Sequence, residues 1–390
     1  MSDLLLDSLL IENFRAFKRL EVKELGRVNL IVGKNNVGKT ALLEALWLYA
    51  ARGAQHVLAE VVRRRDEVAF LSARLRPEEP FDWTQAISSL RYGRPSPAEL
   101  PDVGQNHDAY SSIDERQLFS VGSAYATSTA VHFTLEMPRV GLSIHDPAYQ
   151  KEMWFGAVNP EWLAGQNERY PLAGSLAKAL GARPPHSMVP HYFVPSSGLS
   201  LSKLSLAWKE VVLAGRKDVA RRAIRKIDGS IKDIDFVSAA DVFDRESDRD
   251  IELSLIPICQ RENEVVPVPL RSMGEGMDRL LGLGLAIVVA DGRNGGILLV
   301  DEIENGLHYS VQPDMWRLVF ETAAKLNVQV FATTHSLDCI RAFQAVAEEH
   351  PEEGRLISLR RKQDAPDEIV AIEFDEQGME SIVRSHIEVR

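Results

Sequence analysis

The chain has 390 residues, 45% of them hydrophobic, and a formal net charge of −11 at pH 7. This length and hydrophobic content allow one large domain or two interleaved lobes, and the acidic balance argues against a surface that is basic throughout. The longest apolar run, residues 280–290, is too short to cross a bilayer, and two cysteines are too few for a disulfide framework or a zinc site. Because no secretory signal is recognisable either, we expect a cytoplasmic protein with no membrane partner.

Changes in composition along the chain predict four segments. Residues 1–51 are expected to form an N-terminal lobe, and residues 52–120, which are polar and punctuated by prolines, an irregular helical insertion. Residues 121–270 are expected to form a lobe of strands, and residues 271–390 a long apolar helix followed by further strands. The first segment and residues 121–390 together are expected to build one head.

Short apolar runs bounded by turn residues predict the strands, and longer patterned segments predict the helices. The helices are expected over 41–48, 205–227 and 277–289. The strands are expected at 9–11, 28–32, 130–137, 141–144, 188–194, 251–256, 265–270, 297–300, 328–332, 356–359 and 370–372. No heptad pattern is sustained between residues 50 and 270, which excludes a long coiled-coil arm.

The segment from Gly33 to Thr40 reads GKNNVGKT and fits the phosphate-loop pattern G-x-x-x-x-G-K-[ST]. It lies between the predicted strand 28–32 and the predicted helix 41–48, which is the context that the motif requires. Glycines let backbone N–H groups close around phosphates, and the helix N-terminus adds positive potential. In such a loop Lys39 reaches the β- and γ-phosphate oxygens and Thr40 holds Mg²⁺. The expected nucleotide-binding residues are Gly33, Lys34, Asn35, Asn36, Val37, Gly38, Lys39, Thr40 and Ala41.

The helix predicted over 205–227 carries a basic stripe. Lys217, Arg221 and Arg225 follow one another at helical spacing and are joined by Arg222 and Lys226, so a basic stripe is expected between residues 216 and 226. Such a stripe can follow a phosphate backbone, which makes DNA a possible partner. A solvated helix face explains the same charges without any ligand.

The segment Ser272-Met273-Gly274-Glu275-Gly276 precedes the long apolar helix and resembles the signature segment of the ABC ATPase superfamily. Small residues at a helix start let backbone N–H groups face a phosphate. In that superfamily the segment contacts the ATP that is bound to the phosphate loop of the partner subunit. The resemblance therefore implies nucleotide contacts from Ser272, Gly274 and Glu275, and a head-to-tail dimer in which Lys39 of one protomer and Ser272 of the other close on the same ATP. A glycine-containing helix cap is the alternative.

Two acids, Asp301 and Glu302, follow the four apolar residues 297–300. A Mg²⁺-dependent ATPase needs such a pair at the C-terminal edge of a parallel strand beside the phosphate loop. Asp301 is expected to hold Mg²⁺, and Glu302 to polarise the water that attacks the γ-phosphate. The alternative is a strand that ends in solvated acids.

His335 follows the predicted strand 328–332 and is expected to reach the γ-phosphate and sense whether it is present. Together with Glu302 and Lys39 it completes the expected set of catalytic residues. The C-terminal strands 356–359 and 370–372 are expected to belong to the same sheet.

The order of these motifs resembles a RecF- or SMC-type ABC ATPase without a coiled coil. Four segments are similar to the ATPase part of the OLD (overcoming lysogenization defect) family: 13–17, 33–36, 301–308 and 333–336. This similarity implies an α/β P-loop NTPase fold, an ATPase head with a mixed sheet and a helical insertion, and hydrolysis of ATP to ADP and phosphate. It also implies that Arg15 and Phe17 touch the nucleotide and that the loop 304–308 contacts the partner subunit.

OLD nucleases carry a nuclease domain after the ATPase, whereas here 55 residues follow His335, at the lower limit of the size of a domain. Family members that lack their own nuclease resemble the ATPases of the PARIS and Septu anti-phage systems, which act with a separately encoded effector. We therefore expect the ATPase subunit of a bacterial defence system, gated by nucleotide and working as a dimer or higher oligomer. The alternatives are a RecF-type clamp that closes on DNA and a nucleotide-binding scaffold with negligible turnover.

Overall fold

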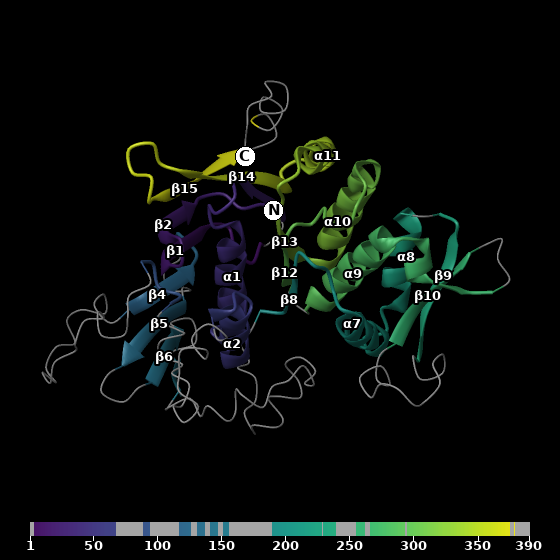
Figure 1. The fold of residues 1–390 in the computed structure, drawn as a ribbon, viewed down its shortest axis with the longest axis horizontal. Coiled ribbons are helices and arrows are strands. Elements are labelled where there is room, and N and C mark those ends of the chain that lie inside the picture. Colours follow the sequence, from purple (N-terminus) through teal and green to yellow (C-terminus); the bar gives the residue numbers. More distant parts are fainter. Residues whose placement is uncertain are drawn as a thin grey trace, which may run out of the picture.

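The computed structural model describes residues 4–67, 89–93, 117–125, 131–136, 141–146, 151–155, 189–227, 229–238, 255–261, 266–292, 295–374 and 378. These residues form two six-stranded sheets, a three-stranded sheet and the helices that cover them (Figure 1).

The central sheet is mixed and has the strand order β15-β14-β3-β13-β12-β8. Its strands are β3 (Val28–Gly33), β8 (His191–Val194), β12 (Gly296–Val300), β13 (Val328–Thr333), β14 (Gly354–Arg361) and β15 (Ile369–Phe374). All neighbours run parallel except β15, which pairs antiparallel with β14 at the edge. β3, β12 and β13 are buried at every position, as parallel strands covered on both faces must be. The carboxyl ends of these three strands meet at one edge, where ligands bind in open α/β sheets.

The second six-stranded sheet is antiparallel, with the order β2-β1-β4-β5-β6-β7. It consists of β1 (Leu9–Phe14), β2 (Phe17–Val22), β4 (Gln117–Gly122), β5 (Val131–Glu136), β6 (Gly141–Asp146) and β7 (Lys151–Phe155). The apolar pattern does not predict β2, β4 or β7. β4 crosses the division between the second and third predicted segments, and its pairing with β1 places Val121 opposite Ile11.

Helix α1 (Lys39–Ala50) lies between the two large sheets (Figure 1). All its residues except Thr40 are buried. They share one hydrophobic cluster with residues of β1, β2 and β4 on one side and of β3, β12 and β13 on the other. α2 (Gln55–Arg63) follows and packs against α1. The phosphate-loop segment therefore leads into a helix that is surrounded by protein.

The other face of the central sheet is covered by α9 (Glu275–Ala290), α10 (Gln312–Leu326) and α11 (Leu337–Ala347). The short 3₁₀ helix η7 (Tyr309–Val311) leads into α10. The predicted apolar helix over 277–289 is confirmed by α9. Trp316 of α10 is fully buried, and its indole N–H donates to the Cys339 carbonyl, which joins α10 to α11.

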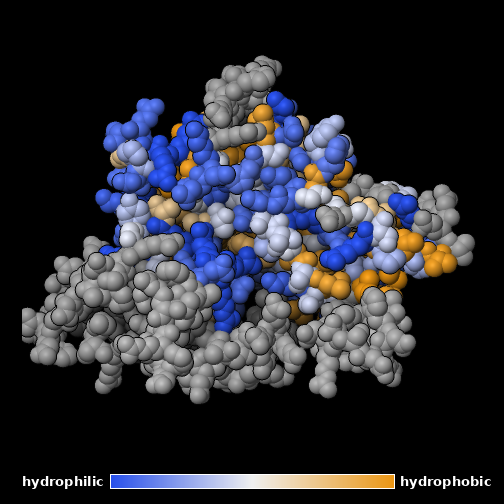
Figure 2. Space-filling view, viewed as in Figure 1, coloured by the Kyte–Doolittle hydropathy of each residue, from blue (hydrophilic) through white to orange (hydrophobic). Residues whose placement is uncertain are grey.

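A smaller unit beside the central sheet has its own hydrophobic cluster, to which α9 also contributes. Its elements are α7 (Leu201–Leu213), α8 (Lys217–Ile227), β9 (Ile231–Ser238), β10 (Leu255–Arg261), β11 (Val268–Pro269) and the 3₁₀ helix η6 (Leu270–Met273). Figure 2 shows hydrophobic residues gathering over this region of the molecule, whereas hydrophilic residues dominate over the central part. Leu213 and Val266 are 86% and 69% exposed.

The single charged helix predicted over 205–227 is wrong, because α7 ends at Leu213 and α8 begins at Lys217. Gly215 has a φ of +68° and donates its N–H to the Val212 carbonyl, and Arg216 donates to the Val211 carbonyl. This pair of hydrogen bonds is the left-handed termination that glycine favours after a helix. Among the described residues, no helix has both the length and the hydrophobicity to span a membrane.

Candidate functional site

The phosphate-loop segment connects the end of β3 to the first turn of α1, as its sequence predicts. Gly33 and Gly38 have φ angles of +148° and +89°. A Cβ atom on Gly38 would lie 2.7 Å from Phe17 Cζ, and one on Gly33 would lie 2.5 Å from the Leu359 carbonyl oxygen. Both positions therefore require glycine, for conformation and for space.

Lys39 is the first residue of α1 and is 6% exposed. Its ammonium donates to the carbonyls of Gly33, at 2.7 Å, and Lys34, at 3.0 Å, so the side chain spans the loop that it follows. Burial lowers the pKa of Lys39, while the carboxylates of Asp301 and Glu302 act to raise it. The positive charge and the two carboxylates thus belong to one electrostatic site.

Asp301, at the end of β12, faces the first turn of α1. Its carboxylate oxygens lie 3.2 and 3.3 Å from the Thr40 hydroxyl, and the Thr333 hydroxyl donates to Oδ1 at 2.6 Å. A hydroxyl and a carboxylate side by side are the hard oxygen ligands that Mg²⁺ prefers. Thr40 and Asp301 therefore fit the metal that the sequence pattern predicts for them.

Glu302 lies one residue further along and has left-handed backbone geometry, with a φ of +47°. Its N–H donates to the Thr333 hydroxyl at 2.8 Å. Its carboxylate lies between two side chains, because Asn305 Nδ2 donates to Oε2 at 2.6 Å and His335 Nε2 lies 3.4 Å from Oε1. The side chain of Glu302 remains 33% exposed, so solvent water can approach the carboxylate.

His335 lies two residues after the end of β13 at Thr333 and is brought to Glu302 by the parallel pairing of β12 with β13. Its backbone N–H donates to Glu304 Oε1 at 3.0 Å. The structure thus brings Lys39, Asp301, Glu302 and His335 to one edge of the central sheet. Sequence reasoning missed Thr333, which contacts both acidic residues. The sequence signal that could have identified Thr333 is a hydroxyl residue at the end of a strand whose neighbour in the sheet ends at the two acids.

The signature segment lies at the start of α9. Ser272 is in the 3₁₀ helix η6 and is exposed, and Gly274 has a φ of +109°. The N-cap of α9 is Gly274 itself, which has no side chain that could cap the helix. A Cβ atom on Gly276 would lie 3.2 Å from the Gly306 carbonyl oxygen, so the helix start approaches the loop after Glu302 closely. Within the described part of the chain, no hydrogen bond or ion pair joins Ser272 to the phosphate loop of its own protomer.

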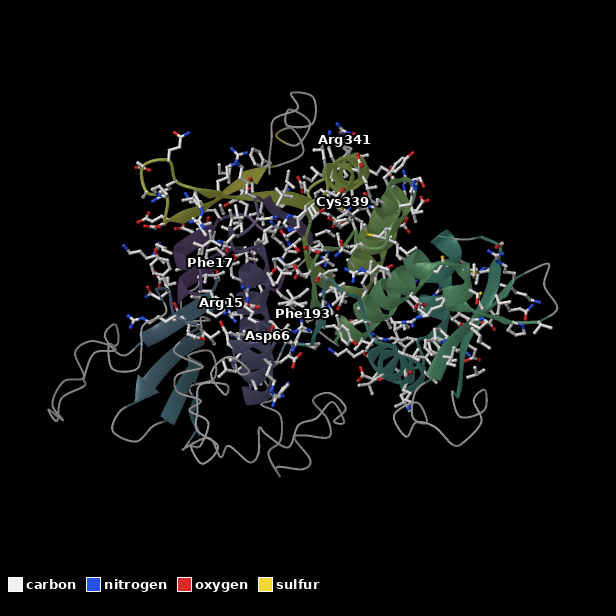
Figure 3. All side chains as sticks on the ribbon, viewed as in Figure 1. Arg15, Phe17, Asp66, Phe193, Cys339 and Arg341 are labelled. Atoms are coloured by element: carbon white, nitrogen blue, oxygen red, sulfur yellow. The ribbon has the colours of Figure 1, made fainter. Side chains whose placement is uncertain are left out.

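Arg15 and Phe17 are buried against α1 and the phosphate loop. Phe17 is fully buried, and its ring packs beneath Gly38. Arg15 is 8% exposed, and its guanidinium forms ion pairs with Glu44 at 2.6 Å and Glu67 at 2.8 Å. Figure 3 shows both side chains beside α1. In this arrangement the two residues support the phosphate loop and α1 from behind, and their contact with the nucleotide stays a prediction.

Two cations of the basic stripe are paired with aspartates of β9. Lys217 Nζ lies 2.7 Å from Asp235, and Arg221 forms ion pairs with Asp233 and Asp218. Arg225 remains exposed. Because aspartates already face Lys217 and Arg221, these two cations offer less positive charge to a nucleic acid than the sequence indicates.

Comparisons with known proteins agree with this geometry. The AAA ATPase domain family matches residues 5–73 and 202–340, which include the phosphate loop, the signature segment, the two acids and His335. An ATP/GTP phosphatase of Helicobacter pylori is 23% identical over 369 residues, which cover 88% of this chain and 89% of that protein.

Shorter or more distant similarities also occur. A DNA replication and repair protein RecF of Rickettsia bellii is 38% identical over 78 residues, which are 20% of this chain and 22% of that protein. The structure of an SMC head bound to the C-terminal winged-helix domain of ScpA aligns with 96% of this chain and 99% of that chain, with 12% identity and a TM-score of 0.44. On the strength of the family match over both halves of the site, the chain belongs to the AAA ATPase domain family and is an ATPase of the α/β P-loop fold.

Proposed function

We propose that the chain is a Mg²⁺-dependent ATPase whose protomers assemble head to tail, with each ATP shared between the phosphate loop of one protomer and the signature segment of the other. The observation that carries the proposal is the start of α9: Ser272 and Gly274 before it are exposed, Gly274 offers no capping side chain, and within the described residues no bond joins Ser272 to the phosphate loop of its own chain. Backbone N–H groups at a helix start favour an anion, and the γ-phosphate bound on a second protomer is an anion of suitable chemistry.

In this proposal the residues at the sheet edge divide the reaction among them. Lys39 neutralises the β- and γ-phosphate oxygens, and Thr40 and Asp301 hold Mg²⁺, which supplies further neutralisation of phosphate charge. Glu302 accepts a proton from water as the water oxygen attacks the γ-phosphorus and the bond to the bridging oxygen of ADP breaks. The products are ADP and phosphate. His335, 3.4 Å from Glu302, donates to the γ-phosphate and links its presence to the position of the carboxylate.

For the biological role we propose an OLD-like ATPase subunit of an anti-phage system, which holds or releases a separately encoded effector according to its nucleotide state. The aspartates that pair with Lys217 and Arg221 of the basic stripe support a protein partner over a nucleic acid. A RecF-like clamp on DNA is the second candidate, and the similarity to RecF over 78 residues favours it. The 23% identical ATP/GTP phosphatase is compatible with either role.

Light scattering coupled to size-exclusion chromatography tests the shared site. Glu302→Gln protein should retain ATP, because it lacks the carboxylate that activates water. A doubling of mass on addition of ATP and Mg²⁺ supports the proposal. Ser272→Glu in the same background should bind ATP as tightly but stay monomeric, because a negative charge would face the partner's phosphate. If the Glu302→Gln protein stays monomeric with ATP bound, the role of Ser272 towards a partner is wrong. A mass that is oligomeric without ATP and unchanged by it indicates a constitutive scaffold.

Anisotropy of a labelled DNA duplex separates the two biological roles. A clamp should bind DNA only with ATP and Mg²⁺, and its affinity should fall steeply as salt rises. Arg225→Glu should weaken that binding if α8 contributes to it. Absence of ATP-dependent DNA binding at low salt would leave the effector role as the better candidate, to be tested by copurification with the products of neighbouring genes in both nucleotide states.

A further inference from the structure

Arg279 lies on α9, one turn after the start of the helix, and its side chain points into the protein. It is 7% exposed. Its guanidinium donates to three backbone carbonyls: those of Pro195 at 2.8 Å, Asp301 at 3.0 Å and Glu302 at 2.8 Å. Two of these carbonyls belong to the residues that carry the site's carboxylates. The helix that begins at the signature segment is therefore tied directly to the turn that presents Asp301 and Glu302.

The turn needs such a restraint. Glu302 is a non-glycine residue with a φ of +47°, a left-handed conformation that L-residues other than asparagine and aspartate seldom adopt. Thr333 holds the N–H of this residue and Arg279 holds its carbonyl, so both polar groups of its backbone are fixed. The direction of the Glu302 side chain follows from this backbone geometry.

The chemistry of the contact is specific to arginine. A planar guanidinium presents its N–H groups in a fixed fork, whereas one lysine ammonium cannot occupy the positions of both terminal nitrogens at once. Burial lowers the pKa of Arg279, while the nearby carboxylates of Glu304, Asp301 and Glu302 act to raise it. Gly198, with a φ of +78°, lies in the turn after β8, and a Cβ atom there would be 3.5 Å from Arg279 Nη1. The turn after β8, the acidic turn and α9 thus meet at one side chain.

Arg27 shows what a buried arginine with only a structural role looks like in this fold. It is 4% exposed and donates to Asn327 Oδ1 at 3.0 Å, with Glu353 at 3.9 Å. It precedes β3 and therefore lies at the opposite edge of the central sheet from the phosphate loop. Arg27 is thus a matched control, equally buried but remote from the carboxylates.

We infer that Arg279 is a positioning residue for ATP hydrolysis, which sets the orientation of the Asp301 and Glu302 carboxylates from the signature helix. The inference rests on the roles proposed above for these two carboxylates. Arg279 touches neither the nucleotide nor the attacking water in this account. Its loss should therefore slow the chemical step and leave ground-state binding of ATP nearly unchanged.

The test compares Arg279→Lys and Arg279→Gln with Arg27→Lys and Arg27→Gln. A fluorescent ATP analogue gives the Kd and the number of competent sites, and kcat is expressed per competent site, so that partial unfolding does not imitate a slower reaction. A displacement of catalytic groups by about 1 Å can cost roughly 100-fold in rate. We expect both Arg279 variants to lose about 10- to 100-fold in kcat with a Kd within about threefold of the original, and the Arg27 variants to keep their kcat.

A double variant separates positioning from general destabilisation. If Arg279 acts through Glu302, adding Arg279→Lys to Glu302→Gln should cost little further rate in single-turnover reactions. A kcat within twofold of the original in both Arg279 variants would overturn the inference, and so would a failure of Arg279→Lys to yield any nucleotide-binding protein, since the residue would then act in folding. The proposed function fails separately, if Glu302→Gln alone hydrolyses ATP at the original rate.

Discussion

Replacement of Thr333 by valine tests the link between the two acidic residues of the site. The hydroxyl is fully buried, donates to Asp301 at 2.6 Å and accepts the N–H of Glu302 at 2.8 Å. Valine keeps the shape of the side chain but supplies neither a donor nor an acceptor. The variant therefore removes one hydrogen bond from the proposed Mg²⁺ ligand and leaves the Glu302 N–H without this acceptor.

Both losses have expected magnitudes. A buried N–H that loses its acceptor costs about 1–3 kcal/mol in the free energy of unfolding. Removing a side chain that orients a metal ligand typically costs about 10- to 100-fold in metal affinity or activity. Thr333→Val should thus be less stable by about 1–3 kcal/mol and should need at least about tenfold more Mg²⁺ for half-maximal ATP hydrolysis.

The neighbouring threonine provides the control. Thr334 is 1% exposed, but its hydroxyl accepts the N–H of Ser336 at 3.0 Å instead of contacting Asp301. Thr334→Val should lose stability to a similar degree and keep its Mg²⁺ dependence. Urea unfolding gives the stabilities, and a Mg²⁺ titration of steady-state hydrolysis gives the half-saturation. Equal Mg²⁺ dependence of the two valine variants would refute the reasoning.

Three further predictions concern the loop and its surroundings. The Gly38→Ala variant should lose most of its ATP binding, measured by fluorescence titration. The added Cβ atom would lie 2.7 Å from Phe17 Cζ, and the φ of +89° at this position disfavours alanine. Tight binding would show that the loop can rearrange. The Lys39→Met variant should bind ATP at least tenfold more weakly, since a loss of about 1.4 kcal/mol of phosphate contact raises the Kd tenfold. Its melting temperature should stay within a few degrees of that of the original protein. An unchanged Kd would contradict this prediction. Burial lowers the pKa of His56 and His191 below the ordinary value of 6.5. As the pH falls below 6.5, these histidines therefore become protonated in the unfolded chain before they do so in the folded protein. Stability should be complete above about pH 6.5 and fall below it by at most about 1.4 kcal/mol per pH unit for each histidine. His191→Phe should flatten this slope in urea unfolding at pH 7 and pH 5.5, and an unchanged slope would exclude His191 as a source.

The motifs that the sequence revealed are those whose chemistry is local. The loop from Gly33 to Thr40 sits between a buried strand and a helix, and Asp301 and Glu302 follow a strand directly, so strand order alone brings them together. Arg15 illustrates the opposite case. Its partners Glu44 and Glu67 become neighbours only in the fold, and family resemblance alone assigned it to the nucleotide.

Contacts to backbone carbonyls were invisible for a related reason. Arg279 bonds to peptide groups of residues that are 22 and 23 positions away, and a carbonyl carries no sequence signature. β4 likewise shows no strand pattern of its own and is recognised only by its pairing with β1. The break between α7 and α8 was detectable, because Gly215 is the residue that commonly terminates a helix.

The burial of α1 determines where movement can arise. This helix is packed between two sheets and holds the phosphate loop in a fixed position. Rotating the helix would require the two large sheets to separate. The unit formed by α7, α8 and β9–β11 has a hydrophobic cluster of its own and meets α9 and α10, the helices that cover the central sheet. If ATP drives a movement, we therefore expect α9 and α10 to transmit it to the α7–β11 unit while the phosphate loop stays in place.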